Sequence, residues 1–229
     1  MPAGGASRLT PMARRDTPAP PRDSAPDVPD DLDEADGLSP RDDLLAARIT
    51  GLADDVLATH ARLVESRVEA ASVALFDATG TTFTDVVVDD LRAVELRLRD
   101  ARWRNVALTG GRIGTLDGLR AAWDGVTLRG IRVGYLSLPS AELADVRFVD
   151  CEIGTLDLPD ATLTRVTFDS CRVDEVDTRG LTGTDLDLRG LDALAFTDPR
   201  ALRGSTLSTR QVEQHAAAFA AAHGVHIAD

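Results

Sequence analysis

Hydrophobic residues recur at every fifth position between residues 71 and 193, and a second hydrophobic column follows the first by two positions. The first column runs from Ala71 to Leu191, and the second runs from Val73 to Ala193. Of their 50 positions 45 are apolar, and none carries a charge. An amphipathic helix repeats every 3.6 residues and a half-buried strand every 2. A period of five therefore predicts a short extended segment with two inward side chains, followed by a corner.

Four such segments make a square coil of twenty residues, and this longer period is also visible. One column holds Ala101, Ala121, Ala141 and Ala161, and another holds Gly111, Ile131, Cys151 and Cys171. Gly114, Gly134 and Gly154 recur at one predicted corner, and Pro139 and Pro159 recur at another. Glycine and proline at fixed positions are typical of tight turns. A fixed period of this length indicates a stacked repeat protein.

The repeats resemble those of the pentapeptide-repeat proteins, whose unit is a small residue, a polar residue, Leu or Phe, and two further residues. Matching units include AELAD from 141, VRFVD from 146, ATLTR from 161, VTFDS from 166 and LDLRG from 186. The resemblance implies an all-β solenoid, a right-handed quadrilateral β-helix. At about 20 residues per coil, we expect six to seven coils.

The remaining sequence divides the chain into four parts. Residues 1–40 hold eight of the eleven prolines and predict a disordered Pro/Asp-rich tail. Residues 41–60 predict an N-terminal cap, either a helix or a degenerate first coil. The repeat β-helix is assigned to 61–205. Residues 206–229 predict a capping helix with a Ser208–Gln211 capping box and an apolar stripe that includes Val212 and Phe219, either a lid on the last coil or a dimer contact.

Composition excludes some partners and sites of action. The net charge is −13, and all 25 basic residues are arginine. We expect no direct binding to nucleic acid or anionic membrane. No apolar stretch approaches 18 residues, and the N-terminus lacks the apolar core of a secretory signal. The expected location is the cytoplasm.

Two columns of charged residues are the candidate interaction surface. An outward arginine column holds Arg92, Arg112, Arg132 and Arg172, interrupted by Glu152. An outward aspartate column holds Asp117, Asp157 and Asp177. Neighbouring carboxylates are compatible with glycoside hydrolysis. On a flat wall without a cleft, however, we expect no catalysis. The columns are either a mutually paired, solvated surface or a binding strip.

No motif for a metal or a cofactor was found, and no cofactor is expected. His223 and His226 lie near the end of the predicted last helix, without the three or four converging ligands that a metal requires. Cys151 and Cys171 fall on one inward position of consecutive coils, which predicts two stacked, reduced and slow-reacting thiols. Trp103 and Trp123 are large for the interior. Gly111 and Gly118 are expected to make room for them, and the alternative is that Trp103 tips outward.

Two functions follow as hypotheses. The first is a non-catalytic protein–protein interaction or scaffold module with an unknown protein partner. The alternative comes from the resemblance, since some family members mimic DNA and modulate type II topoisomerases such as gyrase. The acidic total favours mimicry, but residues 61–205 hold 24 acids against 18 arginines, so the repeat is nearly balanced. A homodimer is left open.

Overall fold

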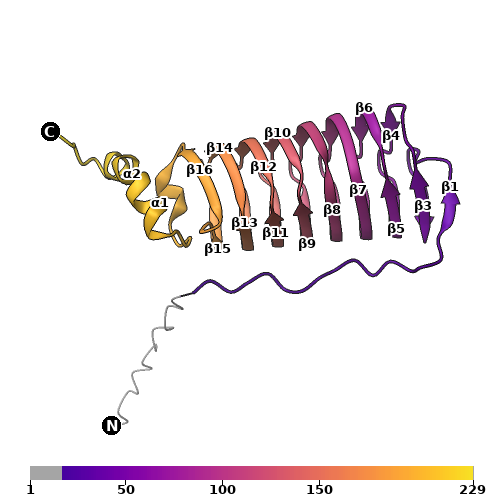
Figure 1. Ribbon diagram of the computed structural model, residues 1–229, viewed down its shortest axis with the longest axis horizontal. Coiled ribbons are helices and arrows are strands. Elements are labelled where there is room, and N and C mark those ends of the chain that lie inside the picture. Colours follow the sequence, from indigo (N-terminus) through magenta and orange to yellow (C-terminus); the bar gives the residue numbers. More distant parts are fainter. Residues whose placement is uncertain (1–16, 229) are drawn as a thin grey trace, which may run out of the picture.

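The chain forms a rod of stacked β-coils with two short helices at its C-terminal end (Figure 1). The computed structural model describes residues 17–228. All strand pairs are parallel, and each strand pairs with the equivalent strands of the coils before and after it. The fold is a parallel β-solenoid with about 20 residues per coil, which confirms the predicted fold class.

The strands are β1 (Asp33–Ala35), β2 (Asp43–Leu45), β3 (Ala47–Thr50), β4 (Val56–Leu57), β5 (Arg62–Glu69), β6 (Ser72–Asp77), β7 (Thr82–Arg97), β8 (Arg102–Asp117), β9 (Ala122–Arg129), β10 (Arg132–Ser137), β11 (Glu142–Val149), β12 (Glu152–Asp157), β13 (Thr162–Asp169), β14 (Cys171–Asp177), β15 (Thr182–Asp187) and β16 (Leu191–Phe196). The helices are a 3₁₀ turn η1 (Pro199–Leu202), α1 (Thr209–Gln214) and α2 (Ala216–Ala222).

The rod is longer than expected. Eight strands follow one another along one side of it: β3, β5, β7, β8, β9, β11, β13 and β15. The solenoid therefore has about eight turns, where the repeat pattern predicted six to seven coils. The additional turn comes from residues before 61, whose hydrophobic pattern is weak.

The core consists of the two inward columns. Phe83, Trp103 and Trp123 stack on successive coils, with ring centroids 5.6 Å apart in each pair. The expectation that Gly118 makes room for these indoles is wrong. A side chain at Gly118 would instead meet Cδ2 of Leu138, at 2.6 Å from the ideal Cβ position. Gly118 therefore accommodates a leucine of the next coil.

The corners differ in construction. Pro139 precedes Ser140, which has a φ of +53°, and the Ala141 amide donates to the carbonyl of Leu138. Proline followed by a positive φ is the pattern of a type II turn, as predicted for this corner.

Gly114, Gly134 and Gly154 lack the positive φ found at the other corners, so a turn conformation that requires glycine, as predicted, does not explain them. They lie within β8, β10 and β12, and an ideal Cβ at each would come within 2.7 Å of a carbonyl oxygen of the preceding coil. Close backbone approach, rather than a positive φ, therefore requires glycine at these positions.

Residues 41–60 form a degenerate first coil, and no helix is present in this segment. Arg48 of β3 pairs with Arg67, nineteen residues later, whereas Val56 of β4 pairs with Phe76, twenty residues later. The corner between β3 and β4 is thus one residue shorter than its equivalent in the next coil. This shift explains why the five-residue frame fitted only part of the segment.

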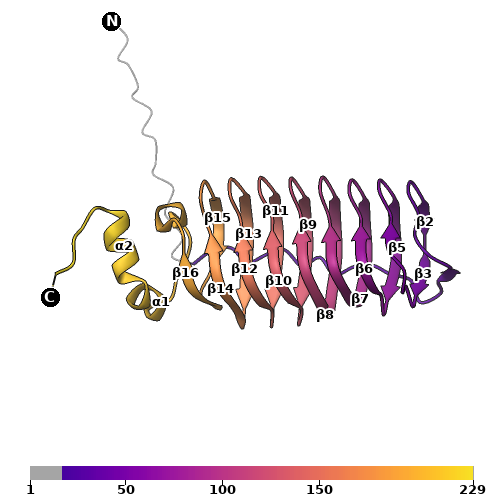
Figure 2. The ribbon, with the colours of Figure 1, turned by 90° about the horizontal axis from the view of Figure 1, so that it is seen from above.

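The predicted disordered tail also differs from the structure where residues are described. Residues 17–32, hereafter the strap, run in an extended course along the rod from the last coils back to the first (Figures 1 and 2). Residues 33–35 then form β1, which pairs with β3. A composition poor in apolar residues excludes an independent core, but it does not exclude docking onto an existing one. Residues 1–16 lie outside the described part.

The C-terminal cap covers the last coil with polar as well as apolar side chains. The predicted capping box of Ser208 and Gln211 is present at the start of α1. The predicted single helix is divided at His215, and Val212 of the predicted apolar stripe is exposed. Gln211 and His215 are buried instead. Gln211 Nε2 donates to the carbonyls of Leu188 and Leu191 at 2.7 Å, which satisfies part of the exposed sheet edge.

Candidate interaction surface

The residues of the predicted arginine column are aligned on successive coils. Arg92 of β7 pairs in register with Arg112 of β8, and Arg112 pairs with Arg132 of β10. The column continues through Glu152 of β12 to Arg172 of β14. The in-register β-ladder thus places three arginines on adjacent coils, about 4.8 Å apart along the rod.

The members of this column differ in their partners. Arg92 Nε lies 3.2 Å from Oδ1 of Asp90, and Arg132 Nε donates to Oε2 of Glu152 at 2.8 Å. Arg112 is exposed and has no carboxylate of the described residues within 4.0 Å. The central guanidinium of the three is therefore available to a negative group from outside.

A row of three glycines runs beside the arginine column, and we call this row the glycine trough. Gly114, Gly134 and Gly154 occupy one position of three successive coils, between the arginine column and the column of Tyr135. Tyr135, which is 40% exposed, stands on the opposite side from the arginines, in the same column as Thr115 and Thr155. A hollow of about 400 Å³ at one end is lined by Glu152, Ile153, Gly154, Arg172 and Asp174. We call this trough and the arginine column the arginine face.

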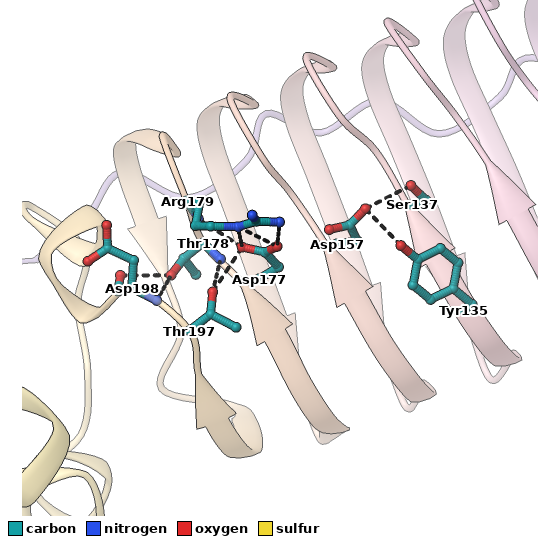
Figure 3. A network of polar contacts seen from close by, with 8 residues as sticks. All are labelled: Tyr135, Ser137, Asp157, Asp177, Thr178, Arg179, Thr197 and Asp198. Atoms are coloured by element: carbon teal, nitrogen blue, oxygen red, sulfur yellow. Dashed lines mark hydrogen bonds and ion pairs between the residues drawn. The ribbon is translucent and has the colours of Figure 1, made fainter.

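The aspartate column lies next to the trough. Its carboxylates already accept hydrogen bonds from side chains of the solenoid (Figure 3). Asp117 and Asp157 are separated by Ser137, and Asp177 follows Asp157. Asp117 accepts from Arg99 Nε at 2.6 Å. Asp157 accepts from the hydroxyl of Tyr135 at 2.9 Å and from that of Ser137 at 3.0 Å.

Asp177 is the most heavily bonded member of the column. It accepts from Arg179 and, at 2.9 Å, from Thr197 Oγ1 (Figure 3). Hydrogen bonding by Arg179 lowers the pKa of Asp177 to about 2, although burial opposes the shift. A general acid needs a carboxyl pKa raised toward the working pH. The geometry of Asp177 therefore supports a structural ion pair.

The Tyr135 hydroxyl is bonded to the aspartate column through Asp157. Burial, and then its hydrogen bond to Asp157, raise the pKa of Tyr135. The phenol therefore stays protonated and donates to that carboxylate. This bond fixes the ring beside the glycine trough, where it offers a rigid apolar surface with a polar edge.

Within residues 17–228, no group of three or more His, Cys, Asp or Glu side chains is arranged to hold a metal ion. Over the same residues, no helix has the length and hydrophobicity needed to cross a membrane.

The chain was compared with known proteins. No protein-family model matches it, and no curated protein matches it. Two solved structures of trypsin-treated variants of QnrB1, described as a plasmid-mediated fluoroquinolone resistance protein, are similar to it. The first is 13% identical, with a TM-score of 0.33, over 85% of this chain and 99% of that one. The second is 14% identical, with a TM-score of 0.26, over 84% of this chain and 100% of that one.

The sequence pattern predicts the two charged columns but not two other features. It did not indicate the glycine trough, because turn geometry was the explanation given to the glycines. It also missed the groove that holds the strap, where Asp85, Asp145 and Asp185 share one corner position. Their separations of 60 and 40 residues, both multiples of twenty, were a visible signal. Its meaning depended on a segment more than fifty residues away in the sequence.

Proposed function

We propose that the protein is a non-catalytic interaction module that docks a protein partner through the arginine face. The observation that carries this proposal is Arg112, which lies between Arg92 and Arg132 without a carboxylate of its own. The solenoid with its five-residue repeat supplies a rigid wall for such docking. The resemblance to pentapeptide-repeat proteins is consistent with this role.

Charge supports an acidic partner. Three like charges about 4.8 Å apart repel one another unless carboxylates neutralise them. Asp90 and Glu152 neutralise the two outer members, whereas Arg112 has no such group. A guanidinium binds a carboxylate through two parallel hydrogen bonds. A glutamate or aspartate of the partner would therefore bind at the centre of the column.

The trough supports an extended partner segment. The absence of side chains at the three glycines leaves the backbone open to close approach of another chain. The row ends at Val94 on one side and at Asp174 on the other, since both occupy the equivalent position in the flanking coils. Tyr135 supplies a half-exposed aromatic contact beside it. An acidic segment lying along the rod fits these features.

The test is Arg112→Glu in the full chain, with a labelled oligoglutamate peptide as the probe. Binding should fall at least tenfold and should weaken with added salt in the parent protein. Arg102→Glu is the matched control, because it makes the same charge change on another side of the rod and Arg102 also forms no ion pair among the described residues. Equal losses in the two variants would refute the assignment to the arginine face.

The second candidate is DNA mimicry directed at gyrase. One observation favours it: the strap adds exposed Asp23, Asp27 and Asp30 along one edge of a rod of roughly 38 Å. Ion pairs such as Arg120–Asp100 and Arg189–Asp187 neutralise much of the remaining wall, which weighs against a continuous negative surface. Inhibition of gyrase supercoiling at low micromolar protein, lost when the strap aspartates become asparagine, would favour mimicry over the acidic-partner proposal.

A further inference from the structure

The strap is held to one corner of the solenoid by hydrogen bonds to its backbone. The amide of Ala19 donates to Oδ1 of Asp185 at 3.0 Å, and the amide of Arg22 donates to Oδ1 of Asp145 at 2.8 Å. In the reverse direction, Arg147 Nη2 donates to the carbonyl of Pro21 at 2.6 Å. These bonds go to main-chain groups of the strap, and the Arg22 side chain adds a longer ion pair, with Nε 3.8 Å from Oδ2 of Asp145. The strap is therefore recognised mainly through its backbone path.

The spacing of these bonds matches a polyproline II helix. Ala19 and Arg22 are three residues apart, and their acceptors Asp185 and Asp145 are two coils apart. Two coils span about 9.6 Å, and one three-residue turn of polyproline II spans about 9.3 Å. Pro18, Pro20 and Pro21 favour this conformation. Three residues of the strap therefore advance along the rod by about the same distance as two coils.

Side chains and backbone at this corner form a groove that holds the strap. Asp145 has a side chain only 2% exposed and accepts both Nε and Nη2 of Arg165, at 2.6 and 2.7 Å. This ion pair holds the carboxylate in place to receive the Arg22 amide. Pro21 is buried against the rod. At Gly125, an ideal Cβ would lie 2.5 Å from Oγ of Ser24, so the strap occupies the space of the missing side chain.

The acceptors owe their positions to an unusual backbone. Asp145 and Asp185 have φ of +56° and +54°, the left-handed region that aspartate tolerates better than most residues. This conformation recurs at the same corner in Asp85, Asn105 and Gly125. The same position also holds Arg165, whose guanidinium binds Asp145, so the repeat presents Asp145 and Asp185 as acceptors two coils apart along the rod.

We propose that this corner is a binding groove for polyproline II segments, and that a proline-rich segment of another protein chain can occupy it in place of residues 17–24. Main-chain recognition makes the groove tolerant of sequence, provided that amide donors recur about 9–10 Å apart. The strap competes as a tethered ligand, with an effective concentration in the millimolar range for short flexible connections. The groove is distinct from the arginine face, so either proposal can fail alone.

The test uses a full chain with a released strap. Ala19→Pro with Arg22→Pro removes both amide donors and keeps the polyproline conformation. A fluorescent peptide of residues 17–28 should bind this variant at least tenfold more tightly than it binds the parent chain. The matched control peptide carries proline at the positions of Ala19 and Arg22 and should bind at least tenfold more weakly. Equal binding of the two peptides would overturn the proposal.

Two further measurements guard against misfolding. Asp185→Gly, added to the released variant, removes an acceptor, suits the positive φ and should weaken peptide binding. In the parent chain, an excess of a peptide with alanine in place of Arg22 should accelerate tryptic cleavage after Arg22, because it displaces the strap. An unchanged cleavage rate under saturating peptide would contradict exchange in trans. Arg112→Glu should leave all these results unchanged.

Discussion

The two cysteines show that the position of a residue within the twenty-residue coil determines whether its side chain is buried. Cys151 and Cys171 are free and buried, at one inward position of neighbouring coils. The neighbouring Cys151 thiol and burial both raise the pKa of Cys171. Their regular spacing reflects coil length, and their side chains fill the core as small hydrophobic groups.

At the same scale, Gly118→Leu should destabilise the protein by about 1–3 kcal/mol through overpacking. The cause is contact with Leu138, since an ideal Cβ at Gly118 lies 2.6 Å from Leu138 Cδ2. The measurement is urea unfolding of Gly118→Leu, Leu138→Ala and the double variant. The double variant should be more stable than the sum of the single effects predicts. Strict additivity would show that Leu138 is not the residue displaced.

Because of Asp177, the free energy of unfolding is expected to fall at acidic pH. Its folded pKa of about 2 lies below the ordinary aspartate value of about 3.9. Its contribution is therefore complete above the ordinary value and is lost as pH falls through the folded value. Urea unfolding should show a stability difference between the parent and Asp177→Asn that shrinks between pH 5 and pH 2.

The control for this measurement is Asp150→Asn. Asp150 is exposed and forms no ion pair among the described residues. Its stability difference from the parent should be small at every pH. A difference for Asp177→Asn that stays constant down to pH 2 would contradict the role given to Arg179.

At the scale of elements, the C-terminal cap shows how an open end of a solenoid is closed. Helix α1 supplies Gln211 and Gln214, whose amides donate to carbonyls of the last coil, and His215 Nε2 lies 3.1 Å from the Ala193 carbonyl. The His215 ring also meets the edge of Phe196, with centroids 5.0 Å apart. Polar and aromatic contacts together replace the coil that would otherwise follow.

Gln211→Leu should therefore destabilise the cap by about 1–3 kcal/mol, because the Leu191 carbonyl loses its donor in a buried place. Val212→Ala is the neighbouring control, since Val212 is 47% exposed and should change stability little. Thermal unfolding and light scattering would measure both stability and aggregation through the uncovered edge. Equal behaviour of the two variants would show that the cap does not depend on this amide.

Prediction from sequence succeeded where a feature is local to the repeat and failed where it is not. The inward columns, the register of Arg92 with Arg112, and the Ser208–Gln211 capping box all follow from short-range spacing. The orientation of the cap depends on the carbonyls of Leu188 and Leu191, which the sequence does not mark. The strap was missed because proline-rich segments carry no core pattern of their own.

At the scale of the whole molecule, the rod is a continuous stack of coils, and the strap runs along its length (Figures 1 and 2). Each coil contacts its neighbours in sequence, as in other solenoids. The strap connects coils that are far apart: its amides reach Asp185, Asp145 and Asp85 within nine residues. It is therefore the longest-range set of contacts in a fold otherwise built from adjacent turns.

This geometry restricts how such a rod can change length. Inserting two coils would separate the anchors by about 9.6 Å more, and three extra strap residues would restore the match at about 9.3 Å. Between the amides of Arg22 and Asp27, five strap residues span the three coils from Asp145 to Asp85, about 15.5 Å against about 14.4 Å. A solenoid that keeps its strap docked should therefore add about three strap residues for every two coils, so the length of the strap limits the length of the rod that it can follow.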